Sequence, residues 1–151
     1  VVDINDKRKK SMAGRIVAAC DGSVKGKKIA VLGVTFKPNT DDMRDSPSLD
    51  IIPALIEAGA TVAAYDPEGM EEARKMLPDI EWCDDAYATM VDADAVALVT
   101  EWNQFRALDL DRVKSLLKSP VMVDLRNVYK PSDMIEAGFT YSSIGRPGQA
   151  G

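Results

Sequence analysis

The chain has 151 residues, 46% of them hydrophobic and 28% charged, which suits one soluble globular domain with a proper core. Its net charge of -5 argues against nucleic-acid binding, which needs a basic face, and no apolar run reaches the roughly 20 residues that span a bilayer. Histidine is absent and the two cysteines lack CxxC spacing, so we expect reduced thiols in a cytoplasmic protein, with no zinc site and no self-sufficient hydrolase activity.

The N-terminal stretch, Val1 to Cys20, predicts a helix that begins without a cap. Its apolar residues recur at helical spacing at Ala13, Ile16, Val17 and Cys20. The basic segment from Lys7 to Lys10 is interpreted either as a solvated helix face or as a contact to phosphate or a partner. A start inside a helical pattern suggests the later part of a longer protein.

The rest of the chain is organised around the stretch from Lys28 to Asp50. Within it, the run from Ile29 to Val34 is apolar at every position, which is typical of a strand covered on both faces of a parallel sheet. A helix is expected to begin at Ser46-Pro47-Ser48, because Ser46 can cap the free amides and Pro47 suits the first helical position.

The loop between that strand and that helix, Thr35 to Asp45, has eleven residues, whereas such loops usually take roughly 2–6. It carries Lys37 and Arg44 in an otherwise acidic protein. Ligands of open α/β sheets bind beyond the carboxyl ends of the strands, so we expect function here.

Strands and helices alternate through the rest of the chain. The expected strands cover residues 61–65, 80–83, 95–99, 121–123 and 139–144, and the expected helices cover residues 49–56, 68–76, 86–90, 109–117 and 134–137. This alternation predicts an α/β fold: a Rossmann-like, doubly wound parallel sheet with helices on both faces, preceded by a long N-terminal helix. The strand over residues 95–99 is expected at the centre of the sheet and the last one at an edge.

The dinucleotide fingerprint of such folds, GxGxxG, is missing, because Gly33 stands alone after the first strand. Asp66 ends the second strand, where a ribose-binding carboxylate would lie. It also precedes Pro67, and a turn-forming role is the favoured explanation.

Three cations lie at the ends of predicted strands: Lys37, Arg44 and Arg126. If the strand order reverses as in the usual doubly wound sheet, they converge on one crevice, where they suit phosphate or ribose oxygens. The alternative for each is a surface salt bridge. Trp102 and Phe105 are interpreted either as a platform for a base or as an aromatic lid over the end of the sheet.

Several of these motifs together resemble one family. The run GVTFKPNTDDMRDSPSLDI, with YDP, TEW and DLRN after later strands, is similar to the C-terminal, UDP-binding domain of the UDP-glucose/GDP-mannose dehydrogenase family. The resemblance spans Val1 to Pro147. It implies part of an NAD-dependent enzyme that oxidises UDP-glucose twice, to UDP-glucuronate.

By this resemblance, Phe36 and Lys37 face the UDP-sugar, and Arg126 lies near the uridine ribose and phosphates. Arg44 reaches across the cleft to NAD, which is bound mainly by an N-terminal domain that is not in this chain. The family's catalytic cysteine is also outside the chain, and Cys20 and Cys83 lie in the wrong contexts to replace it.

The implied organisation is the second half of an inter-domain and dimerisation helix over residues 1–22, a UDP-sugar-binding domain over 23–147 and a frayed tail over 148–151. The whole protein would be a homodimer. The apolar side of the first helix would be partly uncovered without the missing domain. Two alternatives remain: a relative acting on GDP-mannose or UDP-N-acetylmannosamine, and a Rossmann-like interaction module without a ligand.

Overall fold

A computed structural model describes residues 13–20, 22–35, 46, 48–77, 80–100 and 102–143. Residues 13–19 are helical. The elements that follow are β1 (Lys28–Leu32), α2 (Ser48–Glu57), β2 (Thr61–Tyr65), α3 (Met70–Met76), β3 (Glu81–Trp82), α4 (Ala86–Met90), β4 (Ala95–Leu98), α5 (Asn103–Arg106), α6 (Leu110–Leu116), β5 (Val121–Asp124), α7 (Pro131–Glu136) and β6 (Thr140–Ser143).

The strands form one six-stranded sheet in the order β3-β2-β1-β4-β5-β6, and every neighbouring pair is parallel. This is the doubly wound order, in which the chain reverses its direction of travel across the sheet between β1 and β4. The predicted Rossmann-like, doubly wound parallel sheet is confirmed, with β4 central and β6 at an edge.

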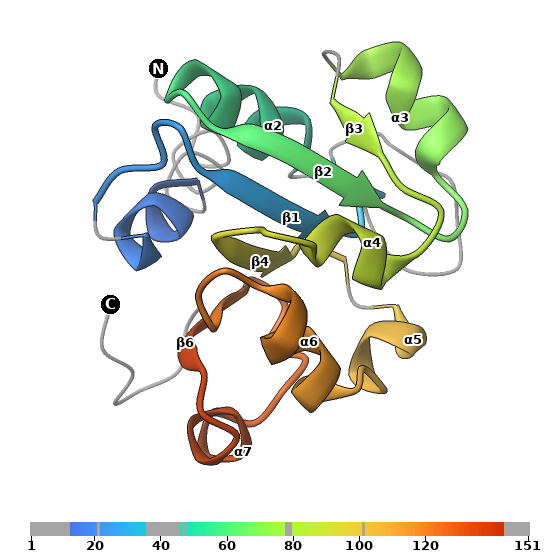
Figure 1. Ribbon diagram of the computed structural model, residues 1–151. Coiled ribbons are helices and arrows are strands. Elements are labelled where there is room, and N and C mark those ends of the chain that lie inside the picture. The colour runs from blue at the N-terminus through green and yellow to red at the C-terminus, as the bar shows by residue number, and fades with distance from the viewer. Residues whose placement is uncertain are drawn as a thin grey trace, which may run out of the picture.

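Helices cover both faces of the sheet (Figure 1). Alternate residues of each strand point to opposite faces, so β1 sends Ile29 and Val31 into one core and Ala30 and Leu32 into the other. The first core lies under α2, α3 and the helix over residues 13–19, and the second under α4, α5, α6 and α7.

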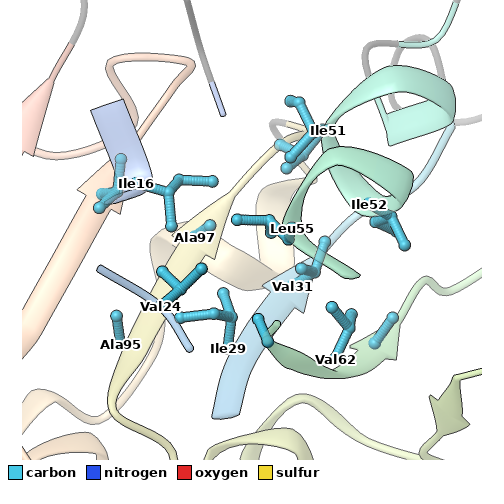
Figure 2. Close-up of a cluster of buried hydrophobic side chains, with 14 of the residues drawn as sticks. Ile16, Val24, Ile29, Val31, Ile51, Ile52, Leu55, Val62, Ala95 and Ala97 are labelled. Atoms are coloured by element: carbon cyan, nitrogen blue, oxygen red, sulfur yellow. The ribbon is translucent and has the colours of Figure 1, made fainter. Parts of the chain in front are cut away.

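The first core is filled from α2, which places Ile51, Ile52 and Leu55 over β1 and its neighbours (Figure 2). All three side chains are fully buried. Burial of such a side chain contributes about 1.5–3 kcal/mol, which is more than the intrinsic helix propensity of so short a segment supplies.

The N-terminal helix segment packs against this same core. Ile16 has no exposed surface, Ala13 and Cys20 are also buried, and Val17 is half-buried. The expectation that this apolar side lies uncovered is therefore wrong for Ala13, Ile16 and Cys20, which are buried, the last two within the first core. The rest of the predicted long helix, residues 1–12, lies outside the described residues.

Most predicted boundaries shift by one or two residues, and α7 begins three residues earlier than predicted, because Pro131 suits the first helical position. β1 stops at Leu32 rather than Val34, because Gly33 turns the chain with φ +88°. The single turn α5 was not predicted, since four residues are too short to show a helical period. The last strand runs from Thr140 to Ser143 among the described residues. No helix within the part of the chain that the structure describes is long and apolar enough to cross a membrane.

Candidate functional site

The carboxyl ends of β1 and β4 lie side by side at the point where the strand order reverses. Ligands of open α/β sheets bind outside this switch point, because the loops diverge there and leave a crevice. The residues that follow each strand at this edge therefore define the candidate site. They are Gly33 to Thr35 after β1, Asp66 after β2, Thr100 and Trp102 after β4, and Leu125 to Asn127 after β5.

Gly33 allows the two central strand ends to approach closely. A Cβ at this position would lie 2.4 Å from Thr100 Cβ and 2.7 Å from the Thr100 backbone nitrogen. The N–H of Gly33 donates to the Tyr65 carbonyl, 2.8 Å away, so the turn begins while β1 is still held to β2. Glycine is needed both for its positive φ and for the contact with Thr100.

Asp66 joins the ends of β1, β2 and β4 through its buried carboxylate. Oδ2 accepts the backbone N–H groups of Val34 (2.8 Å) and Thr35 (3.2 Å), the Thr35 hydroxyl (3.2 Å) and the Trp102 indole N–H (3.1 Å). Oδ1 accepts the backbone N–H groups of Glu68 (2.9 Å) and Gly69 (2.8 Å), which forms a tight turn. With six donors and no exposed surface, this carboxylate is a structural anchor, and the ribose-binding interpretation is wrong.

The backbone N–H, the backbone carbonyl and the side-chain hydroxyl of Thr35 are all hydrogen-bonded. Its N–H and hydroxyl donate to Asp66, and its carbonyl accepts the Thr100 hydroxyl at 2.7 Å. Thr35 is fully buried, and it is the residue from which the long loop departs. The described structure therefore holds the first residue of that loop in one place.

The start of α2 lies against the same strand end. The Ser46 and Ser48 hydroxyls both donate to the Val34 carbonyl at 2.6 Å, and Ser46 Oγ accepts the Ser48 N–H at 3.2 Å. The predicted capping role of Ser46 is confirmed. Pro47 lies outside the described residues.

Trp102 and Phe105 form the aromatic lid rather than a platform for a base. Phe105 is fully buried and meets the Tyr65 ring edge-on, with ring centroids 6.2 Å apart. Trp102 is 6% exposed, and its indole is bound to Asp66. The packed rings and their hydrogen bond leave neither side chain with a face open for stacking on a base.

Arg126 lies in the loop after β5, two residues beyond Asp124, and is half-buried. Its backbone N–H donates to Asp124 Oδ1 at 3.1 Å. Asp124 Oδ2 accepts the Tyr129 N–H at 2.9 Å and the Tyr141 hydroxyl at 2.6 Å. Arg126 is thus held at the carboxyl edge of the sheet, as the sequence predicted.

The other predicted site residues, Phe36, Lys37 and Arg44, lie outside the described residues. Their convergence with Arg126 on one crevice stays a prediction. What the structure adds is the fixed point at Thr35, one residue before Phe36.

Sequence reasoning missed the supporting residues Tyr129 and Tyr141. Tyr129 donates its hydroxyl to the Phe105 carbonyl, and burial raises the pKa of this phenol to about 12. Both tyrosines lie in ordinary apolar patterns, so only the spatial neighbourhood of β5, β6 and α5 identifies them. Asp124 itself had a signal, since it is a charged residue at the end of a buried strand.

The same edge does not fit a dinucleotide in the usual Rossmann position. The close approach that glycines normally allow to a pyrophosphate is taken up at Gly33 by Thr100, and the acidic residue that would hold a ribose is occupied by six donors. No cluster of three metal-ligating side chains occurs among the residues that the structure describes.

Strand order and edge geometry thus define a Rossmann-like α/β domain without the dinucleotide fingerprint. A family model, the UDP-binding domain of the UDP-glucose/GDP-mannose dehydrogenase family, matches residues 30–131. The chain belongs to this family.

Curated relatives extend the similarity to nearly the whole chain. The UDP-glucose 6-dehydrogenase of Rhizobium meliloti is 54% identical over 97% of this chain, and UDP-glucose 6-dehydrogenase TuaD of Bacillus subtilis is 44% identical over all of it. The chain spans about a third of the length of each, 33% in both cases.

Solved structures show the same likeness in three dimensions. An NDP-N-acetyl-D-galactosaminuronic acid dehydrogenase from Methanosarcina mazei superposes with a TM-score of 0.81 at 31% identity, over 93% of this chain and 30% of that one. A UDP-glucose dehydrogenase from Pyrobaculum islandicum gives a TM-score of 0.71 at 31% identity, over 90% of this chain and 29% of that one.

Proposed function

We propose that this chain is the UDP-binding part of an NAD-dependent UDP-glucose 6-dehydrogenase, which oxidises UDP-glucose to UDP-glucuronate in two steps. The observation that carries the proposal is the family match, together with 54% identity to a UDP-glucose 6-dehydrogenase over 97% of the chain. The geometry supports it, because Arg126 is held at the carboxyl edge where ligands of such sheets bind.

The proposed roles follow the resemblance. Phe36, Lys37 and Arg126 bind the UDP-sugar, since a lysine acts as a point charge on phosphate and an arginine fork pairs with phosphate or ribose oxygens. Arg44 contacts NAD, which is bound mainly by an N-terminal domain. The carboxyl edge of this sheet does not fit a dinucleotide in the usual position, so NAD needs another domain. This supports the proposal that an N-terminal domain binds most of the cofactor.

The proposed domain organisation assigns residues 1–22 to an inter-domain helix through which the full-length protein forms a homodimer. Residues 23–147 form the UDP-sugar-binding domain, and residues 148–151 form a tail. The helix over residues 13–19 packs on the first core, so the inter-domain helix would be continuous with this domain's own hydrophobic core.

The chain alone should bind UDP weakly and should have no dehydrogenase activity. A crevice shared by two domains loses contacts and water exclusion when one domain is missing. Isothermal titration calorimetry of UDP against the chain, and an assay for NADH formation from UDP-glucose, measure these two expectations. NADH formation by the pure chain would contradict the second.

Arg126→Ala is expected to remove UDP binding while lowering the free energy of unfolding by only about 1 kcal/mol, the typical cost of a single substitution. Arg74→Ala is the matched control, because Arg74 is exposed on α3 and lies over the Trp82 ring at the β3 edge of the sheet. If UDP binds equally well to both variants, Arg126 is not a ligand. If Arg126→Ala unfolds the chain, its role is structural.

A second candidate is a sister activity on an N-acetylated sugar nucleotide. A UDP-D-ManNAc dehydrogenase from Pyrococcus horikoshii superposes with a TM-score of 0.74 at 25% identity. Parallel titrations with UDP and GDP identify the nucleotide. Comparing full-length enzyme activity on UDP-glucose and UDP-N-acetylmannosamine identifies the sugar.

A further inference from the structure

The end of β5 contains a buried carboxylate that shapes the loop carrying Arg126. Asp124 has no exposed surface, and three donors converge on it. The Arg126 N–H lies 3.1 Å from Oδ1, and the Tyr129 N–H and the Tyr141 hydroxyl lie 2.9 Å and 2.6 Å from Oδ2. Hydrogen bonds to an ionised acceptor are roughly twice as strong as neutral ones.

Two of these bonds close the loop around the carboxylate. Because Asp124 accepts the amides of both Arg126 and Tyr129, it fixes the loop on either side of Asn127. Asn127 has φ +54°, a left-handed conformation that is uncommon for residues other than glycine. Asparagine tolerates this conformation better than most other residues, and the two hydrogen bonds to Asp124 on either side of it hold the loop in this shape.

The third bond comes from the neighbouring strand and is not needed for a turn of this kind. Tyr141 pairs with Met122 in the sheet, and its hydroxyl reaches along the edge to Asp124. The same hydroxyl lies 3.0 Å from the Tyr129 carbonyl, but its single hydrogen is better placed on the nearer carboxylate. Tyr129 in turn donates to the Phe105 carbonyl and so ties the loop to α5.

We propose that Asp124, oriented by the Tyr141 hydroxyl, is the positioning residue that sets the backbone of Arg126 for binding an anionic nucleotide oxygen. This inference rests on the proposed function for the identity of the ligand. Asp124 is buried and accepts three protein donors, so it acts through Arg126 and does not touch the nucleotide. Asp124 positions Arg126 directly, because its carboxylate accepts the backbone N–H of Arg126.

Tyr141→Phe tests this role with the smallest change, because it removes the hydroxyl and keeps the ring in the core. Tyr87→Phe is the matched control: the Tyr87 hydroxyl accepts the Asp109 N–H at 2.9 Å, a bond in which neither Asp124 nor Arg126 takes part. Asp124→Asn is the second variant, because an amide keeps the shape of the side chain but has one acceptor oxygen for three donors.

Two measurements are made on each variant. The first is hydrogen exchange of the Arg126 and Tyr129 amides by NMR without ligand, relative to the amides of β1. The second is the Kd for UDP. In Tyr141→Phe we expect the two loop amides to exchange about tenfold faster relative to β1, and UDP binding to weaken about five- to tenfold. Asp124→Asn should exceed both effects, and Tyr87→Phe should produce neither.

The outcomes separate this inference from the proposed function. If wild type binds UDP and Tyr141→Phe binds it equally well, the positioning role is overturned. If wild type does not bind UDP, the proposed function fails. The exchange data then decide: unchanged loop amides overturn the positioning role, and faster exchange confined to Arg126 and Tyr129 supports it for a different ligand.

Discussion

Six donors converge on the carboxylate of Asp66, which has no exposed surface at the end of β2. Four are backbone N–H groups, one is the Thr35 hydroxyl and one is the Trp102 indole N–H. Each buried donor left without an acceptor costs about 1–3 kcal/mol. The anchor therefore contributes to stability through every group it satisfies.

Asp66→Ala is expected to lower the free energy of unfolding by at least about 3 kcal/mol, because several buried donors lose their acceptor at once. Urea denaturation followed by circular dichroism measures this. Asp84→Ala is the control, since Asp84 is exposed and surface changes stay within about 0.5 kcal/mol. Equal midpoints for the two variants would contradict the anchor role.

Tyr129 gives the chain a specific response to alkaline pH. Burial raises the pKa of its phenol from 10 to about 12, so the folded state favours the neutral form. Its contribution to stability is complete below pH 10 and is lost as the pH rises through 12. We expect the difference in unfolding free energy between wild type and Tyr129→Phe to be constant from pH 7 to 9 and to shrink above pH 10. A difference that stays constant up to pH 12 would argue against the shift.

For single residues, the sequence predicts their position in the fold better than it predicts their hydrogen-bond partners. Asp66 and Arg126 were placed at strand ends because each follows a short apolar run. The partners of Asp66 are 31, 32 and 36 residues away, at Thr35, Val34 and Trp102, and come together only through the parallel crossovers. A pattern along the chain contains no information about such pairings, which is why the ribose interpretation of Asp66 stayed open.

At the scale of elements, the meeting of β1 and β4 depends on one glycine. Gly33→Ala is expected to cost about 2–5 kcal/mol, because the new Cβ would overlap Thr100 and the positive φ strains any L side chain. Thermal and urea unfolding measure the loss.

Gly26→Ala separates the two causes. Gly26 also has a positive φ, +74°, but nothing lies within 4 Å of a Cβ there. It should therefore show only the backbone strain, about 1–2 kcal/mol. A loss at Gly33 no larger than at Gly26 would mean that the strand ends move apart easily.

Helices and strands could be predicted where the sequence pattern of apolar residues matches their burial in the fold. The central strands are apolar at every position because helices cover both faces, and the sequence displays this directly. α5 was missed because its single turn is held by the burial of Phe105 and by the fixed Trp102 rather than by any periodicity. The predicted first strand ends two residues too late, because Val34 is apolar but lies beyond the turn at Gly33.

At the scale of the whole molecule, binding of a nucleotide at the edge should stabilise the entire domain. A ligand that binds only the folded chain adds about 2.7 kcal/mol at a concentration of 100 times its Kd. We expect UDP at that concentration to raise the thermal midpoint of wild type and to leave that of Arg126→Ala unchanged. An equal rise with GDP would indicate a site that does not select the base.

The purely parallel pairing joins segments that are far apart in the sequence. The Lys28 amide and the Asp94 carboxylate meet at 2.9 Å although 66 residues separate them, and β1 has both of its neighbours in the sheet only when β4 is present. Such distant pairings make folding slow, since a long segment must close before any contact rewards it. On the ribosome, β1 keeps an unsatisfied row of amides and carbonyls until residues 95–98 have emerged, and nascent chains stalled before that point expose a template for aggregation.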